Sequence, residues 1–145
     1  MKYRSLIGYK YEVLKDEHIN LPEIRCRGWN EYISLDHSLL IIKARYAWDG
    51  PSGPTFDTPS FMRGSLAHDA LYQLIREGKL NKSYRKAADQ VLRRICLEDG
   101  MSKFRAWYVY KAVRMFGGFS AKPRKKARGR IIQLVKDAKG RLVKK

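Results

Sequence analysis

The sequence predicts an α+β fold, in which a small N-terminal antiparallel β region precedes a unit of three helices. Apolar and polar residues alternate over residues 2–14, and residues 39–48 form an apolar stretch rich in β-branched and aromatic side chains. Both patterns are typical of strands. Residues 49–58 are rich in glycine and proline and have no periodicity, which indicates a loop. Beyond residue 58 the apolar residues follow helical spacing, so we expect the β region over residues 1–48 and helices after the loop.

Between the two strong strand patterns, Tyr32–Leu35 is a weaker strand candidate. The tripeptide that follows, residues 36–38, is Asp-His-Ser and predicts a turn, because short polar side chains bond to their own backbone.

Three helices are expected, over residues 59–77, 81–98 and 103–116. Thr58 is placed to cap the first helix by accepting from a first-turn amide, and Pro59 suits its first position. Ser102 is placed to cap the third helix, whose apolar residues lie on more than one side and therefore predict a heavily buried helix. Glycines stand where each helix is expected to end: Gly78, Gly100 and the pair Gly117–Gly118.

The 145-residue length and 44% hydrophobic content suit one domain, expected over residues 1–120 and followed by a basic tail over residues 121–145. The chain carries 31 Lys and Arg against 14 Asp and Glu, and the tail holds eleven of those cations and one acid, a net charge of +10. This charge favours an anionic partner: nucleic acid, a phospholipid surface or an acidic protein. The tail is interpreted either as a solvated segment or as a nucleic-acid-binding arm.

The spacing of the cysteines and the pattern of the N-terminus place the chain among intracellular proteins. Cys26 and Cys96 lie far apart and show no metal-binding spacing, so reduced thiols are expected. The N-terminus has no uninterrupted apolar stretch of the kind found in a signal peptide or a membrane span.

One group of polar residues has the spacing expected of a catalytic site. If the first two helices fold back across the turn at Gly78, His68 and Asp89 lie level with each other, as do Tyr72 and Arg85, and both pairs share one face. Burying such groups unpaired would cost on the order of a few kcal/mol, so a bond between His68 and Asp89 is expected. A carboxylate that holds one imidazole nitrogen leaves the other able to take a proton from water. The same pair is also compatible with a purely structural role.

The neighbouring Asp69 points about 100° round the helix from His68, towards a sector that the loop from Asp49 to Asp57 is able to cover. Carboxylates and loop carbonyls are the hard oxygen ligands that calcium uses. In such a loop an aspartate such as Asp49 is also a common turn former.

These residues resemble the phospholipase A₂ pattern, especially its short bacterial and fungal branch. In that family a calcium loop precedes a His-Asp-x-x-Tyr helix, and an antiparallel second helix supplies an aspartate. The resemblance covers about 45 residues, and three motifs carry it: Asp49-Gly50-Pro51-Ser52-Gly53-Pro54-x-x-Asp57-x-Pro59, His68-Asp69-x-x-Tyr72 and Ala88-Asp89-x-x-Leu92.

The resemblance implies an ester hydrolase in which His68 is the general base on a water molecule, Asp89 orients it and Tyr72 supports the pair. It further implies calcium as the cofactor, with Asp69 as a ligand and Asp49 or nearby carbonyls completing the shell. The Gly50 amide would help to stabilise the oxyanion. Two departures stand against the calcium site: the family's disulfides are absent, and the glycine spacing of the loop differs.

A second resemblance spans most of residues 1–120. The runs Tyr46-Ala47-Trp48-Asp49-Gly50-Pro51-Ser52-Gly53-Pro54-Thr55 and Arg63-Gly64-Ser65-x-x-His68-Asp69-Ala70-Leu71-Tyr72 are similar to an uncharacterised domain family of tailed bacteriophages and prophages. It implies a location in the host cytoplasm or the virion.

Three functions follow as hypotheses from the two resemblances and the charge. The first is a calcium-dependent lipid esterase acting at an anionic membrane surface. The second is a non-catalytic virion or accessory protein that binds other phage proteins. The third is a nucleic-acid-binding protein that uses residues 121–145.

Overall fold

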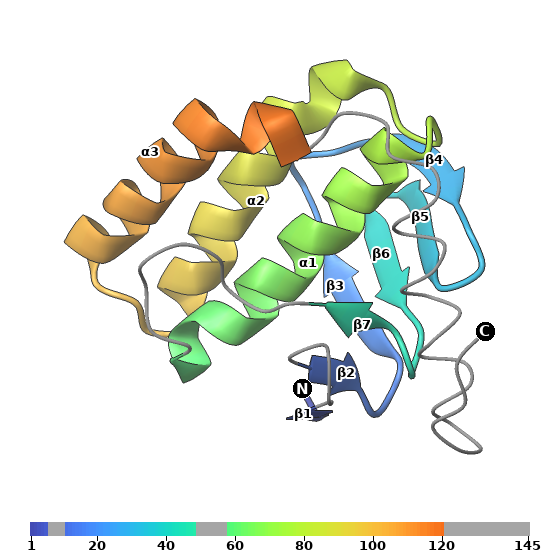
Figure 1. Ribbon diagram of the computed structural model, residues 1–145, viewed down its shortest axis with the longest axis horizontal. Helices are drawn as coiled ribbons and strands as arrows, with labels where there is room; N and C mark the ends of the chain where they lie inside the picture. Colours follow the sequence, from blue (N-terminus) through green and yellow to red (C-terminus); the bar gives the residue numbers. More distant parts are fainter. Residues whose placement is uncertain (6–10, 49–57, 121–145) are drawn as a thin grey trace.

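The structure, a computed structural model of the chain, describes residues 1–5, 11–48 and 58–120. Figure 1 shows strands gathered on one side and three helices on the other, so the predicted α+β class is confirmed. The described strands are β1 (Tyr3–Ser5), β2 (Tyr11–Val13), β3 (Glu17–Asn20), β4 (Cys26–Trp29), β5 (Ile33–His37), β6 (Leu39–Ile42) and β7 (Ala47–Trp48). The helical elements are α1 (Pro59–Arg76), a 3₁₀ turn (Lys82–Tyr84), α2 (Arg85–Glu98) and α3 (Lys103–Ser120).

The described strands form two antiparallel sheets, with orders β1-β2-β7 and β3-β6-β5-β4. The predicted turn between β5 and β6 is confirmed, because His37 has a φ of 57°. Strands β3 and β4 were not predicted from the sequence. Each buries a single residue, Ile19 in β3 and Gly28 in β4, so neither shows the alternation that marks a strand, and each is defined by pairing with β6 or β5.

The core lies between the second sheet and α1. Ile33, Leu35, Leu40 and Ile42 of the sheet belong to the same buried cluster as apolar residues along the whole of α1. Because α1 is buried on most of its circumference, it is the central helix of the fold, and α2 packs on its other side (Figure 1).

The ends of the helices confirm some predicted signals and correct one. Gly78 and Gly100 have φ values of +74° and +97°, which are left-handed conformations that glycine adopts without strain, and they follow α1 and α2 as expected. The Ser102 hydroxyl accepts from the amide of Arg105 at 3.2 Å and caps α3. Thr58 does not cap α1 through its side chain. Its hydroxyl instead accepts from Nη1 of Arg105 at 2.9 Å, so a contact with α3 replaces the local bond.

The expectations for α3 are wrong in two respects. The helix continues through Gly117 and Gly118 to Ser120 instead of ending before them. A Cβ at position 117 would lie 2.5 Å from the hydroxyl of Tyr72, so this glycine permits a close approach of α3 to α1. The helix is also not heavily buried, because several of its large apolar side chains are exposed.

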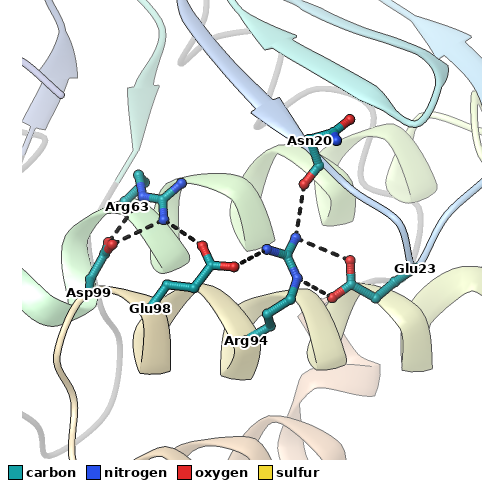
Figure 2. Close-up of polar contacts among 6 residues, drawn as sticks. All are labelled: Asn20, Glu23, Arg63, Arg94, Glu98 and Asp99. Atoms are coloured by element: carbon teal, nitrogen blue, oxygen red, sulfur yellow. Dashed lines mark hydrogen bonds and ion pairs between the residues drawn. The ribbon is translucent and has the colours of Figure 1, made fainter.

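A polar network ties the helices to one another and to the segment after β3 (Figure 2). Arg63 of α1 forms a two-pronged ion pair with Asp99 and also binds Glu98 at 3.0 Å. Glu98 in turn accepts from Arg94, whose guanidinium also binds both oxygens of Glu23. The two arginines therefore hold α1, α2 and the β region in a fixed relation.

Candidate active site

Close contact between α1 and α2 brings the two sides of the candidate site together. Gly64 lies at the contact: a Cβ there would be 2.8 Å from the sulfur of Cys96 and 3.2 Å from the carbonyl of Leu92. His68 follows Gly64 by about one helical turn, on the same side of α1. The short separation of the helices at Gly64 therefore sets His68 against the facing residue of α2, which is Asp89.

The expected bond between His68 and Asp89 is present. Nε2 of His68 lies 2.7 Å from Oδ1 of Asp89, and the hydroxyl of Tyr72 donates to the same oxygen at 2.6 Å. The rings of His68 and Tyr72 lie against each other with centroids 4.1 Å apart. The structure therefore brings together all three residues assigned to the catalytic group, at hydrogen-bonding distance.

Two arginines complete the surroundings of Asp89. Nη1 of Arg114 donates to Oδ2 of Asp89 at 2.8 Å, and Nη1 of Arg85 lies 3.7 Å from the same oxygen. Arg85 also donates to the Tyr72 hydroxyl at 3.3 Å, which confirms that these two residues lie level across the helix pair. Arg114 was not predicted from the sequence. Its only signal in the sequence is an arginine between apolar residues, Val113 and Met115, and its role depends on how α3 packs.

The protonation of the group follows from these contacts. Burial raises the pKa of Asp89, but its bonds with His68, Tyr72 and Arg114 together lower it more, so the carboxyl stays ionised with a pKa below its ordinary value. Burial, together with the adjacent Asp89 carboxylate, raises the pKa of Tyr72 well above its ordinary range. Tyr72 is therefore a neutral hydrogen-bond donor at any physiological pH.

The arrangement suits proton transfer at the outer edge of the imidazole. In the neutral imidazole, a proton on Nε2 that is shared with the ionised Asp89 leaves a lone pair on Nδ1. The described residues contribute no hydrogen bond to Nδ1. The His68 side chain keeps 14% of its surface exposed while Asp89 has none, so solvent reaches the histidine but not its partner.

Asp69, the predicted metal ligand, lies on the neighbouring face of α1 and points towards the end of the first sheet. Its Oδ2 accepts from the hydroxyl of Tyr46 at 2.5 Å, and its Oδ1 lies 4.0 Å from Nη2 of Arg76. The other two predicted calcium-site residues, Asp49 and Gly50, lie outside the described residues. Within residues 1–5, 11–48 and 58–120, no group of three His, Cys, Asp or Glu side chains is close enough to hold a metal ion. One partly exposed carboxylate beside the chain that leads into residues 49–57 is compatible with a cation held mostly by backbone oxygens.

Sequence reasoning also missed a polar chain next to Asp69. The Tyr46 hydroxyl lies 2.9 Å from Oε1 of Gln73, whose amide donates to Glu77 at 2.9 Å. Glu77 accepts in turn from Asn30, which precedes β5. Gln73 is fully buried, so this chain satisfies its amide and fixes the face of α1 that carries Asp69.

Comparison with protein families matches residues 32–113 to the family described as Protein of unknown function (DUF1353), over more than half of the chain. The chain belongs to this DUF1353 family. The matched part of the DUF1353 protein contains His68, Tyr72 and Asp89 and ends one residue before Arg114. Comparisons with curated proteins and with solved structures gave no match.

In the described part of the DUF1353 protein, no helix is both long and apolar enough to cross a bilayer.

Proposed function

We propose that this protein is a phospholipase A₂-type lipid esterase in which His68 activates a water molecule. The observation that supports the proposal most directly is the 2.7 Å contact between Nε2 of His68 and Oδ1 of Asp89. It fixes the imidazole through Nε2, in a side chain that keeps 14% of its surface exposed, and Nδ1 has no bond to the described residues. An oriented imidazole beside a solvent-accessible surface is the basic requirement for general-base hydrolysis.

The proposed reaction uses the group as follows. Nδ1 of His68 takes a proton from water as the water oxygen attacks the ester carbonyl, which gives a tetrahedral intermediate and a cationic imidazole. Asp89 stabilises this cation through Nε2. Collapse of the intermediate breaks the bond to the alcohol oxygen, and His68 returns its proton to that oxygen. The products are a fatty acid and a lysophospholipid.

Tyr72 and the two arginines act on Asp89 and not on the substrate. Their bonds keep the carboxylate ionised and fixed in place, so they are positioning residues. Arg114 and Arg85 also balance much of the charge of Asp89.

We further propose calcium as a cofactor, with Asp69 as its side-chain ligand. The ion when bound would polarise the ester carbonyl. Its remaining ligands would come from residues 49–57, including Asp49 and Gly50. The contact between Asp69 and Arg76 opposes this assignment, and removal of calcium tests it directly.

The decisive experiment is release of fatty acid from phospholipid vesicles in the presence of calcium or of a chelator. Replacing His68 with alanine should lower the rate by about 10²- to 10⁴-fold, the usual contribution of a general base. The matched control is His37→Ala, because His37 is also bonded to an aspartate, Asp36, at 2.8 Å but lies exposed at the end of β5. Full activity in His68→Ala would contradict the mechanism, and full activity with the chelator would contradict the calcium assignment.

A non-catalytic role is the second candidate, because the same contacts satisfy Asp89 completely without a substrate. On that reading the protein is a phage virion or accessory protein that keeps the helix pair for stability and binds other virion proteins. It predicts no turnover by the unaltered protein and loss of folding in His68→Ala. Circular dichroism of the variant separates the two candidates, because the esterase proposal expects a folded, inactive protein.

The excess charge of residues 121–145 supports a third candidate, binding of nucleic acid. That candidate expects affinity that falls steeply with salt and is lost when the segment is deleted.

A further inference from the structure

We propose that the outward side of α3 is a docking surface for an anionic phospholipid bilayer. This inference rests on the proposed function, since it names the surface that would bring the esterase to its substrate. The surface, called the α3 face below, consists of Phe104, Trp107, Tyr108, Lys111, Met115 and Phe116.

The α3 face is a continuous apolar stripe exposed to solvent. Position 104 is followed three and four residues later by 107 and 108, and then by 111 and 115, so these positions lie in one row along the helix; Phe116 lies about 100° round the helix from Met115. The five apolar side chains are between 44% and 75% exposed. The opposite side of α3 is buried against α2 through Ala106 and Val109. Large aromatic side chains are therefore directed away from the core by a helix that already has its packing partner.

Figure 1 shows that α3 is the outermost helix, separated from the sheets by α1 and α2. The α3 face belongs to this single helix. The exposed apolar side of one amphipathic helix suits insertion into a membrane interface, where apolar side chains enter the boundary between head groups and acyl chains. Single-stranded nucleic acid is bound instead in a positively charged groove lined by aromatic rings, and α3 alone does not form such a groove.

Charge identifies the bilayer as anionic and disfavours other occupants. The helix contains four cations and no acidic residue. Arg114 is paired with Asp89 and Arg105 donates to Thr58, so Lys103 and Lys111 are the cations that would meet lipid head groups. Two other occupants of the α3 face are a second copy of the chain and the chain's own residues 121–145. The second copy would bring the same positive helix, and residues 121–145 carry a net charge of +10, so both would be repelled. Acidic phospholipid head groups would be attracted.

The amphipathic side chains of the α3 face suit the membrane interface in detail. Trp107 and Tyr108 combine an apolar ring with a polar group, which favours the depth of the head groups. Nζ of Lys111 lies 6.0 Å from the centre of the Trp107 ring, so a cation and an aromatic ring lie together on the α3 face.

The other side of the same helix borders the candidate active site. Arg114 binds Asp89, and Gly117 lies against the Tyr72 hydroxyl. Docking through the α3 face would place α3 between the bilayer and the His68–Asp89 pair, with the pair about 10 Å, one helix diameter, behind the contact surface. The helix that contacts the bilayer also supplies a residue that positions the general base.

Co-sedimentation with vesicles tests the docking surface independently of catalysis. The probes are vesicles of phosphatidylcholine alone and vesicles containing about one third phosphatidylglycerol. We expect the full chain to bind the anionic vesicles, and the double substitution Phe104→Ser/Trp107→Ser to weaken binding by at least about tenfold. Trp29→Ser is the matched control, because Trp29 is 63% exposed but lies on β4, away from α3; it should bind as the unaltered protein does.

A spectroscopic measurement guards against loss of folding. In a Trp29→Phe background, the emission of Trp107 should shift to shorter wavelength when anionic vesicles are added, because the ring enters a less polar environment. Trp48 is buried and should not respond. An unchanged spectrum for protein that sediments with the vesicles would overturn the assignment to α3.

Two further variants separate this inference from the proposed function. His68→Ala should lose hydrolysis but keep vesicle binding, and the α3 double substitution should keep hydrolysis of a short-chain ester dissolved as monomers. Equal vesicle binding by the double substitution and the unaltered protein would overturn the docking surface. So would equal binding to neutral and anionic vesicles, or self-association that is abolished by the double substitution in the absence of lipid.

Discussion

Replacing Asp89 with asparagine tests how much the buried carboxylate, which contacts residues of all three helices, contributes to the stability of the fold. Asp89 is fully buried and accepts from His68, Tyr72 and Arg114. Asparagine keeps the shape and one oxygen for His68 and Tyr72. Its NH₂ group, however, would face Nη1 of Arg114 across 2.8 Å, donor against donor, and Arg85 would lose a charge 3.7 Å away.

The expected loss of stability follows from the burial of these partners. Removing one member of a buried ion pair costs about 3–5 kcal/mol. Because Arg114 and Arg85 keep 29% and 22% of their side-chain surface exposed, they are able to turn partly to water. We therefore expect the lower end, a decrease of about 3 kcal/mol in the free energy of unfolding.

Urea unfolding at pH 7, followed by circular dichroism, measures this decrease. With a slope of about 2 kcal/mol per molar urea, the midpoint should fall by about 1.5 M. The matched control is Asp36→Asn, because Asp36 also binds a histidine and an arginine but is exposed; its midpoint should change little. Equal midpoints for Asp89→Asn and the unaltered protein would refute the reasoning.

The same comparison has a defined pH dependence. Burial raises the pKa of Asp89, but the bonds from His68, Tyr72 and Arg114 bring it below the ordinary value of 3.8. A carboxyl whose pKa is lower in the folded state stabilises the protein above its unfolded pKa, and this contribution is lost as the pH falls through the folded value. The contribution of the Asp89 carboxylate should therefore be lost as the pH falls below about 4, and the advantage over Asp89→Asn should shrink there. An advantage that grows as the pH falls from about 4 to about 2 would contradict the assigned contacts.

Three further changes have defined outcomes. Gly117→Ala should displace the Tyr72 hydroxyl, 2.5 Å from the added Cβ, and lower stability by about 1–3 kcal/mol in thermal unfolding; an unchanged midpoint would show that α3 does not approach so closely. Arg94→Met should remove the two-pronged pair with Glu23 and lower the free energy of unfolding by about 1–2 kcal/mol. Because salt screens the ion pair, the difference between the unaltered protein and the variant should be smaller in 1 M salt; an equal difference at low and high salt would contradict an electrostatic contribution. Cys96 is buried and its pKa is raised to about 12 by burial, so iodoacetamide should leave it unmodified in the native protein while the partly exposed cysteine of β4 reacts, as read by mass spectrometry; rapid modification of Cys96 would contradict the helix contact.

The helix pair shows how far local sequence information reaches. The breaks at Gly78 and Gly100, with the proline that begins α1, determine where the first two helices lie along the chain. Once two helices are joined by a short turn, residues equally distant from that turn must face each other. The pairing of His68 with Asp89 was therefore predictable before any coordinates, and the structure confirms it at 2.7 Å.

The failures concern features that depend on contacts between distant segments. Thr58 has a normal capping sequence, but its hydroxyl accepts from Arg105 of α3. Gly117 and Gly118 resemble a helix end locally, yet α3 continues through them because the missing Cβ makes room for Tyr72. Strands β3 and β4 each bury one residue and are held by their neighbours in the sheet.

By itself, the sequence determined the α+β class, the order of the β region and the three helices, and the facing pair on α1 and α2, because periodicity, glycine stops and a short turn act over a few residues. Tertiary structure alone decided that Arg114 reaches Asp89, that Asp69 is bonded to Tyr46, and which side of α3 is exposed. Each of these depends on the rotation and separation of whole helices. Those quantities are set by close contacts, such as those at Gly64 and Gly117, between residues far apart in the chain.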